Sequence, residues 1–65
     1  MSNEDRAKQR IHDIANLFVN GTPKPTLCWA NTAVYYIAGE FDIYPTVAQG
    51  WFSEAFAVLA ARRKV

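Results

Sequence analysis

The chain has 65 residues, of which 51% are hydrophobic and 20% charged, and its formal net charge is +1. A chain this short has room for a single domain, residues 1–65, and one core of this size seldom supplies more than about 3–5 kcal/mol. Nucleic-acid-binding domains usually have a clear basic excess, so the near balance of charge gives DNA or RNA binding no support.

The chain has few of the residues that form stabilising disulfides or metal sites in small domains. Cys28 is the only cysteine and His12 the only histidine, so the chain cannot form an internal disulfide or a zinc site of Cys and His ligands. We therefore expect no metal and no cofactor. Oligomerisation, the other common way of stabilising a small domain, stays open.

The first residues and the longest apolar stretch bear on where the protein works. Residues 1–5 are polar and acidic and no apolar segment follows them, which does not fit a secretory signal. The longest nearly apolar stretch, residues 27–38, is well short of the ~20 residues that cross a bilayer. We expect a cytoplasmic protein with no membrane span.

A first helix is predicted over residues 3–20. Its apolar side chains recur at helical spacing and form one stripe: Ala7, Ile11, Ile14, Ala15 and Phe18. Ser2 followed by Asp5 resembles a capping box, and Gly21 marks the end. Glu4 and Lys8 are spaced for an i,i+4 ion pair on the opposite, solvated face.

A second helix is predicted over residues 26–38, after the proline-containing loop 21–25. Thr26 can cap it and Gly39 can end it. Polar Asn31 and Thr32 align with Cys28 and Tyr35, which leaves an apolar stripe for the core: Leu27, Ala30, Val34, Ile37 and Ala38. The alternative is a β-hairpin over residues 33–44, because residues 34–37 also have high strand propensity.

A third helix is predicted over residues 46–63. Thr46 and Gln49 match a capping box, and basic residues occupy the last turn. The apolar stripe is broad and consists of Val47, Trp51, Ala55, Val58 and Leu59, widened by Phe52 and Phe56. The predicted fold class is all-α, a compact three-helix domain, with the α+β hairpin form as the alternative.

One short motif raises the question of catalysis. Cys28-Trp29-Ala30 at a predicted helix start resembles the segment that contains the nucleophile in papain-like cysteine peptidases. That resemblance implies a glycine-rich approach and a histidine downstream, whereas Pro25-Thr26-Leu27 precedes Cys28 and no histidine follows it. We therefore expect no catalytic residue and a protein that is not an enzyme.

The nine aromatic residues exceed what one small core can face at once, since they fall on several sides of the predicted helices. The sequence predicts a protein–protein interaction module, such as a small adaptor, inhibitor or regulatory protein, whose partner is another protein or a second copy in a homo-oligomer. The expected contact residues are Tyr35, Tyr44, Trp51, Phe52 and Phe56. Trp51 is the first expected anchor.

A nucleic-acid-binding regulator resembling a helix-turn-helix protein is the alternative function. Residues 46–63 would then be the recognition helix, and Arg62, Arg63 and Lys64 would contact phosphate. The first half of that helix presents Trp51, Phe52 and Glu54 in place of the Arg, Lys or Asn that read bases. Protein partners are therefore favoured over nucleic acid.

Overall fold

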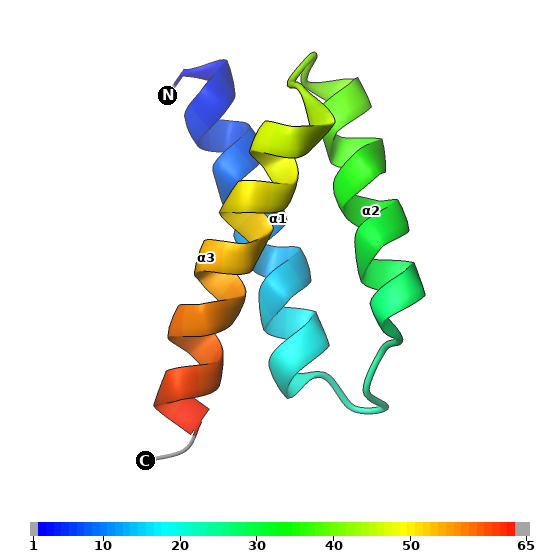
Figure 1. Ribbon diagram of the computed structural model, residues 1–65, viewed down its shortest axis with the longest axis vertical. Coiled ribbons are helices and arrows are strands. Elements are labelled where there is room, and N and C mark those ends of the chain that lie inside the picture. The colour runs from blue at the N-terminus through cyan, green and yellow to red at the C-terminus, as the bar shows by residue number, and fades with distance from the viewer. Residues whose placement is uncertain (1, 64–65) are drawn as a thin grey trace.

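The computed structural model describes residues 2–63 and contains three helices, α1 (Asn3–Asn20), α2 (Leu27–Glu40) and α3 (Pro45–Arg63). The helices run alternately down, up and down the molecule (Figure 1). The predicted three-helix, all-α class is confirmed. The hairpin alternative over residues 33–44 is wrong, because α2 continues through most of that segment and residues 2–63 contain no strand.

The ends of α1 follow the sequence prediction. The Ser2 side chain accepts a hydrogen bond from the Asp5 backbone N–H at 3.1 Å, which satisfies one of the free donors of the first turn. At the other end the Gly21 N–H donates to the Leu17 carbonyl at 2.8 Å. Gly21 has ordinary extended dihedrals, but a Cβ there would collide with the Leu17 carbonyl oxygen, so the close approach requires glycine.

The start of α2 is as predicted, but its end is not. Thr26 caps the helix by accepting from the Trp29 N–H at 3.1 Å. The helix passes through Gly39, the predicted stop, and ends after Glu40, because Asp42 adopts the left-handed conformation with φ of 56°. The Ile43 N–H then bonds the Ala38 carbonyl at 2.8 Å and the Asp42 N–H bonds the Gly39 carbonyl at 3.4 Å, which is a Schellman motif.

The start of α3 also differs from the prediction. The helix begins at Pro45, one residue before the predicted boundary, and the Tyr44 carbonyl accepts from the Val47 and Ala48 N–H groups. Proline suits the first helical position, since its φ is already helical and no N–H is lost there. Among the described residues Thr46 and Gln49 form no capping-box hydrogen bond, so that prediction is wrong.

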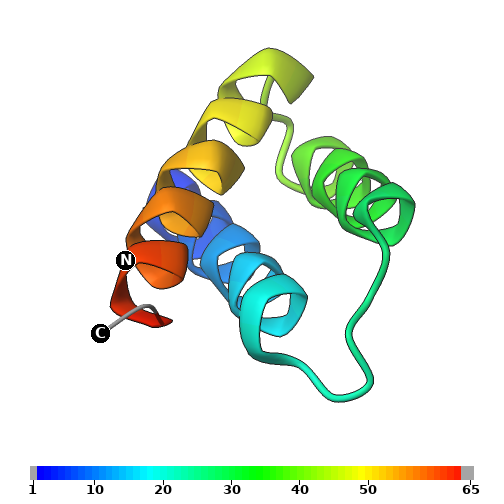
Figure 2. The same cartoon turned by 60° about the horizontal axis from the view of Figure 1, so that its bottom comes forward.

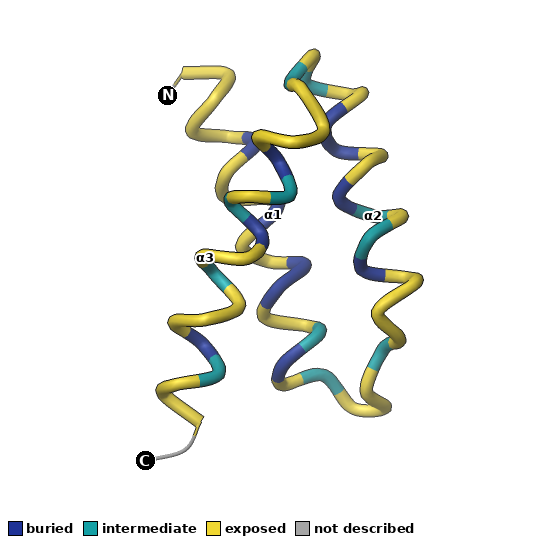
Figure 3. Tube along the Cα trace, in the orientation of Figure 1, coloured by how far each residue is buried: buried dark blue, intermediate teal, exposed yellow. Residues whose placement is uncertain are grey.

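The core is formed by one stripe from each helix (Figure 3). Its buried members are Ala7, Ile11, Ile14, Ala15, Val19, Ala30, Val34, Ile37, Ala38, Ala48, Phe52 and Leu59. The predicted stripes of α1 and α2 largely agree with this set, but Leu27 was wrongly included, since it lies in the first turn of α2, borders an open hollow and is 57% exposed. In α3 the predicted Phe52 and Leu59 are buried, but Val47 and Val58 are exposed, and Ala48, which was not predicted, faces the core.

The three helices are not equally engaged. α3 packs along α1 more extensively than either packs on α2, and α2 stands to one side of that pair (Figure 2). The Asn3 side-chain amide donates to the Phe41 carbonyl at 2.9 Å and so ties the start of α1 to the turn after α2. No helix within residues 2–63 combines the length and apolar character needed to cross a membrane.

Candidate functional site

Phe52 and Phe56, both expected contact residues, lie in an aromatic cluster with Phe18. The Phe18 ring centroid is 6.0 Å from that of Phe52 and 5.6 Å from that of Phe56. Phe52 is only 6% exposed, so it is a core residue and cannot serve as a contact without unfolding. Phe56 is 38% exposed and, with Leu27 and Ser53, lines an apolar hollow of about 340 Å³.

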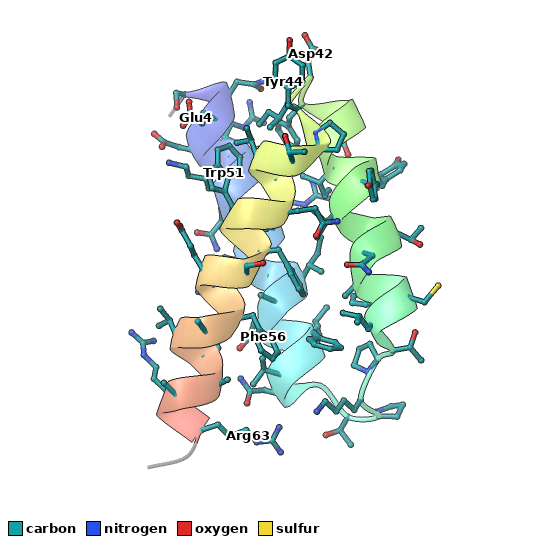
Figure 4. The ribbon with its side chains drawn as sticks, in the orientation of Figure 1. Glu4, Asp42, Tyr44, Trp51, Phe56 and Arg63 are labelled. Carbon is teal, nitrogen blue, oxygen red and sulfur yellow. The ribbon has the colours of Figure 1, made fainter. Side chains whose placement is uncertain are left out.

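Tyr44 and Trp51 lie toward the opposite end of the molecule, on the side of the start of α1, where Glu4 is (Figure 4). Both line an open hollow of about 370 Å³, together with Asn3, Glu4, Phe41, Asp42, Ile43 and Val47. Tyr44 projects from the turn and is 80% exposed. Trp51 is only partly exposed, since it packs against the core.

Trp51 also has a partner on α1. The Lys8 ammonium lies 5.1 Å from the Trp51 ring centroid, within cation–π range, and 3.4 Å from the Glu4 carboxylate. The expected first anchor is therefore partly covered by the protein's own side chains. Replacing Trp51 would disturb this packing, so a binding defect in such a variant would not by itself locate an interface.

Tyr35, the fifth expected residue, is 57% exposed on α2 and lies apart from both groups. It belongs to a larger surface that we call the α2 outer face, composed of exposed residues opposite the buried stripe: Cys28, Trp29, Thr32, Tyr35, Tyr36 and Gly39. Trp29 is 41% and Tyr36 70% exposed. The sequence prediction omitted both, although their spacing of seven places them on one side of a helix.

The α2 outer face differs from the rest of the surface in charge. Residues 27–39 contain no charged side chain, and Glu40 is the first one. The outer face of α1, in contrast, carries Glu4, Lys8 and Asp13 among its polar residues. Charge appears only at the two ends of α2, with Lys24 in the loop before it and Glu40 and Asp42 after it.

Of the basic residues at the end of α3, Arg63 is held by α1. The Arg63 guanidinium donates to the Val19 carbonyl and fastens the end of α3 to α1. Arg62 is exposed, and Lys64 lies outside the described residues. Residues 45–61 contain no basic side chain, so the first four turns of α3 offer no cation for a phosphate.

The described part of the chain offers few residues that could bind a metal ion or react with a ligand. Cys28 is exposed on the first turn of α2 and not buried. Within residues 2–63 no three His, Cys, Asp or Glu side chains come together in a way that would hold a metal ion. The candidate functional features of the described residues are therefore the α2 outer face and the two hollows.

The fold and these surfaces define a small three-helix domain with an uncharged aromatic face on its least engaged helix. Comparison of the chain with protein-family models, curated proteins and solved structures gives no match.

Proposed function

We propose that this protein is a non-enzymatic protein–protein interaction module that docks through the α2 outer face. The observation that carries the proposal is the exposure of Trp29, Tyr35 and Tyr36 on a helix with no charge from residue 27 to 39. The centres of protein interfaces are depleted in charged residues and enriched in Tyr and Trp. Few-residue hot spots are also rich in these two types.

The size of the aromatic surface supports the same function. At 41%, 57% and 70% exposure the three rings present on the order of 400 Å² to solvent, taking about 230 Å² for a whole aromatic side chain. Contiguous apolar patches of roughly 300–600 Å² on monomeric proteins are often functional. A single exposed ring would need no explanation, but three on one helix face do.

The two hollows support docking less well than this face. The hollow beside Tyr44 includes the carboxylates of Glu4 and Asp42, which a partner would have to desolvate or pair. The hollow beside Phe56 is apolar, but the buried Phe52 ring lines it, so a substitution of Phe52 would alter folding.

Affinity capture with variants tests the proposed function. The tagged wild-type chain, Tyr36→Ala and Tyr44→Ala are compared as baits in an extract of the source cells, with bound proteins identified by mass spectrometry. Tyr44 is a matched control, since it is an exposed tyrosine outside α2. We expect a partner, or the chain itself, to be retained by the wild type and Tyr44→Ala and lost from Tyr36→Ala. Retention by Tyr36→Ala with loss from Tyr44→Ala would contradict the assignment to α2.

A further inference from the structure

We infer that the partner of the α2 outer face is a second copy of this chain, paired with it antiparallel about a two-fold axis. This inference rests on the proposed function and names its partner. It is carried by the acidic residues at one end of α2, by the absence of charge along the helix and by its exposed aromatic area.

The two ends of α2 differ in charge. Glu40 is the last helical residue and Asp42 lies two positions beyond it, and both are exposed. The first turn of α2 contains no acidic residue, and the Lys24 ammonium in the loop before it is turned toward α1, 5.8 Å from the Phe18 ring centroid. Two antiparallel copies keep the acidic ends of the two helices apart, whereas a parallel pair places them together.

The helix dipole acts in the same direction. The first turn of α2 contains no acidic residue, so its positive end has no carboxylate of its own. An antiparallel partner brings Glu40 to that end, where negative charge is stabilising. Since α2 has 14 residues and is about 21 Å long, the two ends are far enough apart to act independently.

The middle of the α2 outer face is suited to contact with the same face of a second copy. A two-fold interface apposes the same patch on both copies, so a charged patch would meet its own charges, whereas residues 27–39 have none. Cys28, Thr32, Tyr35 and Gly39 lie on one line of the helix, and a Cβ at Gly39 would touch nothing. Trp29 and Tyr36 flank that line at opposite ends of the face, so each Trp29 faces the Tyr36 of the other copy.

The area is sufficient for a weak dimer. About 400 Å² of aromatic surface on each copy, with the polar neighbours added, approaches the roughly 1,000 Å² in total at which specific interfaces begin. We therefore expect reversible association and not an obligate dimer.

The first test is sedimentation equilibrium of the wild-type chain, Thr32→Lys and Ala57→Lys. Thr32 is exposed near the middle of the face, where an added ammonium meets its symmetry mate, and Ala57 is an exposed control on α3. We expect the wild type and Ala57→Lys to form dimers and Thr32→Lys to associate at least about 10-fold more weakly. A monomeric wild type, or dimers of unchanged affinity in Thr32→Lys, would overturn the inference.

Charge reversal tests the orientation and does not depend on how Thr32→Lys folds. Glu40→Lys should weaken the dimer by about 3- to 10-fold, since it replaces the carboxylate beside the positive end of the partner's α2 with an ammonium. If Glu40→Lys associates as tightly as the wild type, the antiparallel pairing is wrong.

Thiol cross-linking gives an independent geometric readout. In an antiparallel pair Cys28 of one copy lies near Gly39 of the other, while the two Cys28 thiols are about 16 Å apart along the helices. Mild oxidation should therefore join two copies of Gly39→Cys and leave the wild type uncross-linked. Rapid disulfide formation in the wild type would show a parallel pair. A monomeric wild type whose α2 outer face binds a different protein would defeat this inference and leave the proposed function standing.

Discussion

α1 and α2 pack into the core in the same way, but they differ on the side that faces away from the core. Both bury a stripe of small and branched apolar residues. The outer face of α1 is charged and internally paired, with Glu4 bound to Lys8 and Gln9 bonded to Asp13. The outer face of α2 has no charge and three exposed rings. Folding therefore accounts for both faces of α1 and for only one face of α2.

The comparison shows which aromatic residues are structural. Rings that contact other rings or the core, such as Phe18 and Phe52, contribute to stability. Rings on the α2 outer face contact solvent and contribute little to the fold of one chain, so another role explains them better. The predictions below separate these two groups by measuring the free energy of unfolding, at protein concentrations low enough to keep the chain monomeric.

The largest effect is expected at Phe52. Phe52→Ala removes a ring that is 6% exposed and leaves a cavity, at a cost of about 3–5 kcal/mol. That equals the whole stability of many domains of this size, so the variant should be largely unfolded by circular dichroism. Tyr44→Ala is the matched control and should change the unfolding free energy by less than about 0.5 kcal/mol. A stably folded Phe52→Ala would return this residue to the candidates for partner contact.

Two neighbours on α2 should separate its two faces. Ile37 is 3% exposed and Tyr36 is 70% exposed. Ile37→Ala should lower the unfolding free energy by about 2–5 kcal/mol in urea titrations. Tyr36→Ala should change it by less than about 0.5 kcal/mol, since little is buried there. Similar losses in both variants would mean that the outer face also stabilises the single chain.

Two glycines should respond oppositely to alanine. Gly21→Ala places a Cβ against the Leu17 carbonyl oxygen and should cost about 1–3 kcal/mol through backbone strain. Gly50→Ala, in the middle of α3, meets no neighbour within 4 Å and should gain about 0.5–1 kcal/mol from helix propensity. Thermal unfolding followed by circular dichroism compares them directly. A neutral Gly21→Ala would show that the end of α1 can relax.

The smallest effect is expected on the outer face of α1. Lys8→Ala breaks the exposed pair with Glu4 and the contact with the Trp51 ring. We expect a loss of about 0.5–1 kcal/mol, which falls as salt is added because the pair is solvent-exposed. Lys8→Met keeps the aliphatic stem and serves as the control for lost packing. A loss above 2 kcal/mol would mean that Lys8 supports the core through Trp51.

The sequence predicts α1 almost to the residue because its stripe, its Ser2 cap and Gly21 agree with one another. The end of α2 was missed because glycine is the commoner left-handed terminator, and here Asp42 takes that conformation. Three positions of the α3 stripe were wrong because the buried Ala48 looks weaker in the sequence than Val47 and Val58, which are exposed.

The candidate surface was only partly predictable. The surplus of rings indicates that some are exposed. The sequence does not distinguish a buried ring from an exposed one when both lie on a broad apolar stripe, which is why Phe52 was included among the expected contact residues. Trp29 and Tyr36 were omitted because the expected polar strip of α2 consisted of Cys28, Asn31, Thr32 and Tyr35. The actual outer face is rotated away from Asn31 toward Trp29 and Tyr36, and only the packing of α2 on both other helices determines that rotation.

The most direct test of the α2 outer face is sedimentation equilibrium of the wild-type chain and Tyr36→Ala over the same range of concentrations. We predict that the apparent mass of the wild type rises toward that of two chains, while Tyr36→Ala stays near its 7.3 kDa monomer mass with an unchanged helical spectrum. Equal association of the two chains, or none in either, would contradict self-association through this face.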